Sequence, residues 1–167
     1  MYKRQLLTLV VPRFVKWDAR PGNAIIRADG RMAWIDWEDC GARNRLDDMA
    51  WLLGDEFVPD LPIEVEERLL AAHVPHFADD MPLADAVEYL SAYGTLHMCV
   101  RLGMILNERG GGPWWDQELC LATDQVGVTL EHARRLCRRA ARWSARSAIV
   151  RALSPWFDEV EKRLGQL

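Results

Sequence analysis

The sequence lacks a membrane-spanning run, a secretory signal and the cysteine spacing of a metal site. Its four cysteines are spread over 167 residues without C-x-x-C or Cys/His ligand spacing, so we expect reduced thiols in a cytoplasmic protein. No apolar run approaches the ~20 residues of a membrane span, and residues 6–11 are too short for a secretory signal. We therefore expect no contact with a membrane.

The composition shows no extreme of charge, glycine or proline. The net charge is only -4, too mild to indicate a polyanionic partner. Half of the residues are apolar, which excludes disordered and collagen-like chains and leaves room for one core but not for two full domains. Tryptophan is the one excess: four of the eight crowd the first third, namely Trp17, Trp34, Trp37 and Trp51.

The pattern predicts a mostly α fold with a small β-hairpin. Two short apolar runs, residues 23–28 and 31–36, flank Asp29-Gly30, a strong hairpin signal. Residues 6–15 are apolar and β-branched, which indicates a buried strand or an entering segment. From Leu46 onward the spacing is helical. We expect helices at residues 47–57, 63–76, 83–107, 114–123, 125–150 and 155–164.

Three polar residues carry the chemistry that the sequence indicates. Asp18 precedes Asn23 by five residues, and Asp36 lies thirteen further on, at the end of the hairpin. Kinase phosphoryl transfer requires such a set: an Asp that takes the hydroxyl proton, and an Asn and an Asp that bind the metal. The hairpin can bring Asn23 and Asp36 to the same metal-bound phosphates, and hard oxygen ligands suit Mg²⁺. Each residue alone is equally typical of a turn.

Residues 14–53 resemble the aminoglycoside phosphotransferase and choline kinase-like family, which has a protein-kinase-like fold. The resembling segments are Lys16-Trp-Asp-Ala-Arg-Pro-Gly-Asn23, Ile35-Asp-Trp37 and Arg43-Asn-Arg-Leu-Asp-Asp-Met-Ala50. The resemblance implies Asp18 as catalytic base, Asn23 and Asp36 as Mg²⁺ ligands, and Asp48 as a helix-start brace of the catalytic loop. It also implies ATP and a small-molecule hydroxyl acceptor.

The chain departs from that family at two motifs. Lys16 and Trp17 stand where the family has His-Gly, and Arg43-Asn44-Arg45 stands where it has Gly-Asp-Pro. We hypothesise that Lys16 supplies a positive charge to the phosphates, which would make it a cofactor-binding residue.

The resemblance implies the C-terminal lobe of such a kinase. We expect a single domain over residues 1–167, with the catalytic loop and metal hairpin in residues 14–45 and a helical body in residues 46–167. Only 17 residues precede Asp18, too few for an N-terminal nucleotide lobe, and residues 1–5 look like a non-native start. We expect a longer kinase whose missing lobe packs on the hairpin side, and little or no activity from this fragment. The alternative is a non-catalytic, pseudokinase-like binding module.

Several other patterns each have two readings. An acidic run could attract a cationic acceptor or could be ordinary solvated charge; it comprises Glu38, Asp39, Asp47, Asp55 and Glu56. A stripe of arginines could bind an acidic partner or be a solvated helix face; it comprises Arg134, Arg135, Arg138, Arg139, Arg142 and Arg146. We expect the solvated face and no nucleic-acid binding.

Two shorter patterns also have two interpretations. His73 and His76 have helical spacing but no third ligand nearby, and Trp114-Trp115 could line a pocket or the core.

Overall fold

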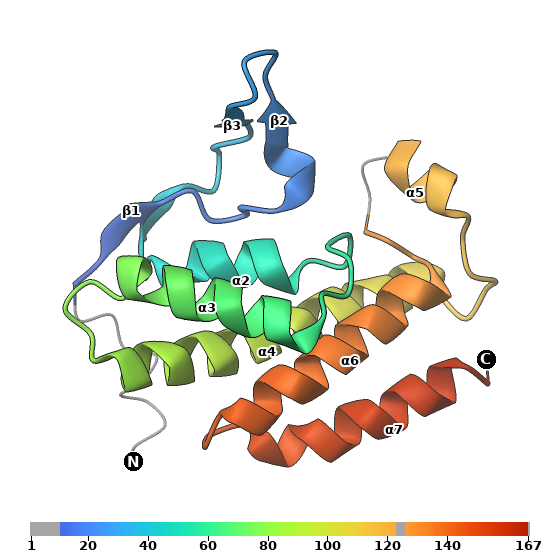
Figure 1. Ribbon diagram of the computed structural model, residues 1–167. Coiled ribbons are helices and arrows are strands. Elements are labelled where there is room, and N and C mark those ends of the chain that lie inside the picture. Colours follow the sequence, from blue (N-terminus) through green and yellow to red (C-terminus); the bar gives the residue numbers. More distant parts are fainter. Residues whose placement is uncertain (1–10, 123–125, 167) are drawn as a thin grey trace.

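The computed structural model describes residues 11–122 and 126–166. They form a mostly helical body, as expected from the sequence, with two small antiparallel sheets where only one hairpin was predicted. Strand β1 (Arg13–Val15) pairs with β4 (Gly41–Arg43), and β2 (Ala24–Ile26) pairs with β3 (Met32–Trp34). Figure 1 shows the β2–β3 hairpin projecting away from the helices.

The Asp29-Gly30 turn closes the hairpin. Gly30 has a φ of 77°, which residues other than glycine rarely adopt. The main-chain N–H of Arg27 donates to the carbonyl of Arg31 at 2.8 Å across the turn. The strands are shorter than predicted, and a 3₁₀ turn, η1 (Pro21–Asn23), leads into β2. The predicted first strand is described only from Val11, and its one buried apolar side chain is Val15.

The six predicted helices are all present. The helices are α2 (Leu46–Gly54), α3 (Ile63–Phe77), α4 (Leu83–Arg109), α5 (Gln117–Ala122), α6 (Leu130–Arg146) and α7 (Ser154–Leu164), with a 3₁₀ turn η2 (Arg151–Leu153) before α7. Three of them, α2, α5 and α6, are shorter than expected. None of the described helices has the length and apolar character of a membrane span.

The prediction of one helix over residues 125–150 is wrong at both ends, because side chains cap the shorter helix α6. The Thr129 hydroxyl accepts from the main-chain N–H of His132 at 3.1 Å, which starts the helix. Beyond Arg146 the chain turns away, because Glu88 of α4 accepts from the hydroxyl of Ser147 and the N–H of Ala148, at 2.6 and 2.9 Å.

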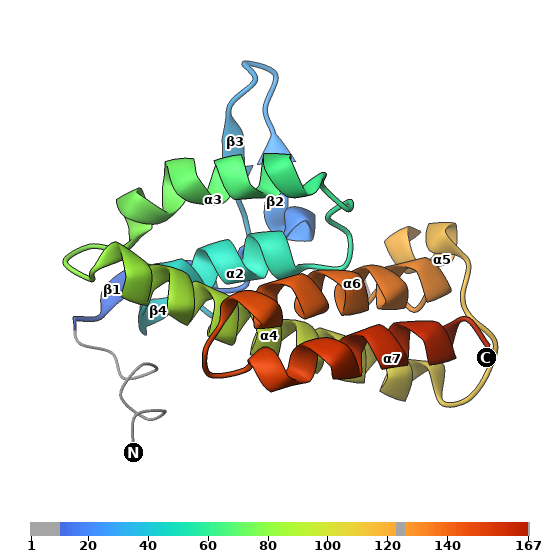
Figure 2. The same cartoon turned by 60° about the horizontal axis from the view of Figure 1, so that its bottom comes forward.

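Helix α4 is the centre of the body. It packs against α2 and against α6, and α7 packs on α6 (Figure 2). Gly94 of α4 lies against the buried indole of Trp143 of α6, and a Cβ at this glycine would meet ring atoms at 2.2 and 2.4 Å. The two helices therefore need this glycine to approach each other.

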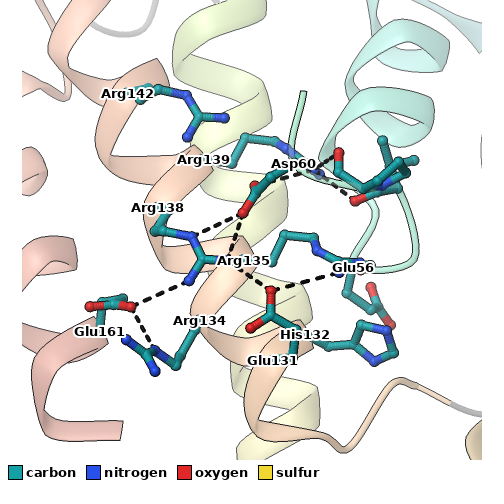
Figure 3. A network of polar contacts seen from close by, with 12 residues as sticks. Glu56, Asp60, Glu131, His132, Arg134, Arg135, Arg138, Arg139, Arg142 and Glu161 are labelled. Carbon is teal, nitrogen blue, oxygen red and sulfur yellow. Dashed lines mark hydrogen bonds and ion pairs between the residues drawn. The ribbon is translucent and has the colours of Figure 1, made fainter. Parts of the chain in front are cut away.

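The arginines of α6 do not form the fully solvated face expected from the sequence, because they contact neighbouring segments. Figure 3 shows Arg134, Arg138 and Arg139 joined to acids and carbonyls. Arg138 pairs with Asp60 at 2.6 Å and with Glu131 at 2.9 Å, and Arg134 pairs with Glu161 of α7 at 2.6 Å. These ion pairs tie α6 to α7 and to the segment after α2.

Arg139 is the most deeply buried member of the arginine stripe. It is 2% exposed, and its guanidinium donates to four main-chain carbonyls, that of Leu53 in the last turn of α2 and those of Asp55, Val58 and Pro59 in the segment that follows. Arg139 thus satisfies the carbonyls at the end of α2, which have no helical partners. Its role is structural support of the segment that leads away from the candidate site.

Candidate active site

The candidate catalytic loop follows β1 and has a strained backbone. Trp17 and Asp18 both have a φ of 49°, and Asp36 has a φ of 56°. They are three of the four non-glycine residues with positive φ in the described chain. Such conformations are rare outside glycine and gather at functional sites, where the surrounding contacts enforce them.

Asp48 supplies the contacts that hold this loop. Its two carboxylate oxygens accept hydrogen bonds from the main-chain N–H groups of Lys16 and Trp17, at 3.1 and 2.8 Å. Asp48 lies in the first turn of α2, so the helix fixes its position. Burial raises the pKa of this carboxyl, while the two N–H donors act in the opposite direction. These are the contacts of the loop brace that the resemblance implies.

Lys16 lies beneath the loop with its side chain only 4% exposed. Its ammonium donates to the main-chain carbonyl of Asp36 at 2.6 Å and to that of Asp18 at 3.2 Å. The lysine therefore joins the catalytic loop to the end of the hairpin. This geometry favours a bracing role over the phosphate-binding role that we hypothesised from the sequence.

Asp18 and Asn23 contact each other directly. The side-chain nitrogen of Asn23 donates to the Asp18 carboxylate at 2.6 Å and to the Asp18 carbonyl at 3.1 Å. Arg20 lies 3.4 Å from the other carboxylate oxygen. The amide of Asn23 is thus turned with its nitrogen toward Asp18, which leaves its oxygen as the atom for a metal. Asn23 is buried, whereas Asp18 is half-buried and lines a cleft.

Asp36 ends the hairpin, two residues after β3, and is exposed. The N–H of Ile35 donates to the carbonyl of Asn23 at 2.9 Å, which holds the two ends of the hairpin together. An amide oxygen and a carboxylate are hard ligands that fit Mg²⁺. Within residues 11–122 and 126–166, no three His, Cys, Asp or Glu side chains gather as a metal site. Asn23 and Asp36 are candidates because the resemblance implies them.

A cleft of about 820 Å³ opens beside Asp18. It is lined by Trp17, Asp18, Arg20, Asp39, Trp51, Tyr93, Leu96, His97, Val100, Arg101, Met104, Glu108 and Val126. Trp17 and Trp51 meet edge to face at 5.4 Å between centroids, and the indole N–H of Trp17 donates to the Tyr93 hydroxyl at 3.2 Å. A cleft of this size accepts a small molecule with the Asp18 carboxylate on its wall.

The acidic run of the sequence is largely absent from the surface. Asp47, Asp55 and Glu56 are 5%, 1% and 0% exposed. Asp47 accepts from the Tyr89 hydroxyl at 2.6 Å, and burial raises its pKa to about 6. Burial also raises the pKa of Asp55 to about 6. Neither alternative, attraction of a cationic acceptor or solvated charge, therefore holds for these three acids, since each is packed into the body.

Arg101 lines the cleft from α4 and is not among the residues that the sequence indicated. Its guanidinium forms two hydrogen bonds with Glu56, one of them at 2.8 Å, and both side chains are buried. The only sign of this residue in the sequence was a single arginine within an otherwise apolar helical pattern. Its acidic partner lies 45 residues away, so only the fold connects them.

The remaining candidate residues lie away from the cleft. His73 and His76 are exposed on α3. Trp114 is partly buried against the core, with the guanidinium of Arg109 4.2 Å from its ring centroid. The four cysteines are unpaired thiols.

Comparisons with protein-family models, with curated proteins and with solved structures gave no match.

Proposed function

We propose that this chain is the catalytic lobe of an ATP-dependent phosphotransferase that acts on a hydroxyl of a small molecule, with the architecture of a protein-kinase-like C-terminal lobe. The observation that most directly supports this proposal is the chain of hydrogen bonds that links Asp48, Lys16 and Asp36. Asp48 binds the two N–H groups that precede Asp18, and Lys16 ties the carbonyls of Asp18 and Asp36. One set of contacts thereby positions both proposed reactive carboxylates.

In this mechanism Asp18 orients the acceptor hydroxyl and takes its proton. The hydrogen bond from Asn23 fixes the carboxylate, so that one oxygen can face the cleft. Asn23 and Asp36 would hold Mg²⁺ through their oxygens, and the ion would neutralise charge on the phosphates of ATP. Catalysis of this type is mostly positioning and charge stabilisation, which is what the loop contacts provide.

A nucleotide lobe packed on the hairpin side belongs to the proposal. Phe14 and Trp37 stack there with 6.0 Å between ring centroids and are 70% and 44% exposed. Ile26 and Met32 of the hairpin are also exposed, at 70% and 50%. Neighbouring exposed apolar side chains are typical of a surface that another domain covers.

Paramagnetic Mn²⁺, a substitute for Mg²⁺, tests the metal site directly. In ¹⁵N-labelled protein we expect Mn²⁺ to broaden the backbone amide signals of Asn23 and Asp36 before others, and the variant Asp36→Asn to abolish this. Asp39→Asn, an exposed carboxylate three residues away, is the matched control and should leave the broadening unchanged. Equal broadening in wild type and Asp36→Asn would contradict the phosphotransferase and favour a non-catalytic binding module.

A further inference from the structure

The cleft beside Asp18 has two ends of different chemistry. Its polar end contains Asp18, Arg20 and Arg101, and its apolar wall contains Leu96, Val100 and Met104. These two kinds of lining indicate which chemistry a ligand of the cleft would have.

The polar end is held in place by a buried ion pair. Glu56 accepts twice from the guanidinium of Arg101 and once from the main-chain N–H of Gly127, the last at 3.1 Å. Arg101 is 5% exposed and cannot swing out of the cleft without leaving Glu56 as an unpaired buried charge. Arg101 is therefore a fixed polar group of the cleft lining, and Glu56 balances its charge.

The apolar wall is a continuous row along α4. Leu96, Val100 and Met104 are spaced by four residues, which places them on one helix face. They are 41%, 62% and 44% exposed, although α4 is otherwise the central helix of the body. Val126 lines the same cleft. A ligand in the cleft would cover this row.

The charge of the cleft is nearly balanced. Three carboxylates, of Asp18, Asp39 and Glu108, line it together with two guanidinium groups. His97 is 8% exposed, and burial beside Arg101 lowers its pKa to about 4, which leaves it uncharged at neutral pH. Its Nε2 has no hydrogen-bond partner in the described chain.

The cleft offers a cationic ligand fewer contacts than the acidic run of the sequence suggested. The indole ring of Trp17 already has the guanidinium of Arg43 3.7 Å from its centroid, so this cation–π position is occupied. Asp47, Asp55 and Glu56, which could have drawn a cation from solution, are buried in the body.

We propose that the cleft binds a neutral, largely apolar molecule whose body covers Leu96, Val100 and Met104 and whose hydroxyl faces Asp18. The role of the hydroxyl rests on the proposed phosphotransferase. The apolar binding does not, because it depends only on the α4 wall. Small-molecule sites commonly combine such a wall with a few fixed polar groups that orient the ligand.

Binding of 2-(1-naphthyl)ethanol, a neutral fluorescent alcohol, tests this without any activity measurement. Fluorescence polarisation titrations would compare the full chain with Val100→Asp. Val87→Asp is the matched control, because Val87 is also an exposed valine of α4 but lies outside the cleft. Ile26→Asp probes the exposed hairpin as a competing apolar surface. We expect Val100→Asp to weaken binding at least tenfold and both other variants to change it less than twofold.

Three outcomes would overturn the proposal: no binding by the wild-type chain, a change of less than twofold in Val100→Asp, or a tenfold loss in Ile26→Asp. Displacement of the probe by an equal concentration of spermidine would also overturn it, because a polycation would then be the better ligand. A negative Mn²⁺ result leaves these measurements unaffected, so the two proposals fail separately.

Discussion

The ammonium of Lys16 donates a 2.6 Å hydrogen bond to the main-chain carbonyl of Asp36, twenty residues away. The same ammonium contacts the carbonyl of Asp18 at 3.2 Å. One buried lysine thus joins the two strained segments that carry the proposed catalytic and metal-binding carboxylates. The lysine stands where the resembling family has histidine, and it provides a connection between loop and hairpin.

Lys16→Met tests this connection, because methionine keeps much of the apolar stem and removes the donor. Two carbonyls lose a charged hydrogen-bond donor, and we expect the free energy of unfolding in urea to fall by about 1–3 kcal/mol. The Mn²⁺ broadening at Asp36 should weaken as well. Lys162→Met, at an exposed site on α7, should have no effect. Unchanged stability and broadening would remove the bracing role.

Asp48→Asn tests the hydrogen bonds by which the Asp48 carboxylate holds the loop. Asparagine has one acceptor oxygen where aspartate has two, so one of the N–H groups of Lys16 and Trp17 loses its partner. We expect a loss of about 1–2 kcal/mol in unfolding free energy and faster hydrogen exchange at that N–H. Asp85→Asn, in the first turn of α4 and exposed, serves as control. Exchange as slow as in the wild type would contradict the brace.

The buried carboxyl of Asp47 makes stability depend on pH in a defined direction. Burial raises its pKa to about 6 in the folded protein, from the ordinary 3.8 of an aspartate. Between these values the folded state holds more protons than the unfolded state, so stability decreases as pH rises from 4 to 6. Asp47→Asn should flatten this slope, with Asp55 contributing the remainder, and should raise stability at pH 7 by about 1–3 kcal/mol.

Urea titrations at several pH values would measure this effect. Asparagine can still accept from the Tyr89 hydroxyl, so the substitution removes the charge and not the hydrogen bond. Asp80→Asn, at an exposed position, is expected to leave the slope unchanged. A variant as pH-dependent as the wild type would show that Asp47 is not responsible.

Two glycines of α4 should respond to alanine with opposite signs. At Gly94 a Cβ would overlap the Trp143 ring, so Gly94→Ala should cost about 1–3 kcal/mol by overpacking. At Gly103 nothing lies within 4 Å, so Gly103→Ala should stabilise the helix by up to ~1 kcal/mol. Thermal unfolding of both variants measures this. A Gly94→Ala variant as stable as Gly103→Ala would contradict the close packing of α4 and α6.

The local elements could be predicted because their signals lie close together in the sequence. Asp29-Gly30 predicted the hairpin, and apolar spacing predicted all six helices. The extent of α6 could not be predicted from periodicity, because Thr129 begins the helix and Glu88, a residue of α4, binds the segment that follows it. Asp18, Asn23 and Asp36 were predicted as site residues from their spacing and from the resemblance, and their roles stay predictions.

By itself, the sequence determined the element types and the polar residues of the candidate site, since both depend on short-range spacing. Tertiary structure decided which charges face solvent. Burial turned Asp47, Asp55 and Glu56 into internal groups and engaged the α6 arginines with distant acids and carbonyls. Lys16 changed from a candidate phosphate ligand into a loop brace for the same reason. A buried charge must find a partner, and where that partner lies is a property of the fold.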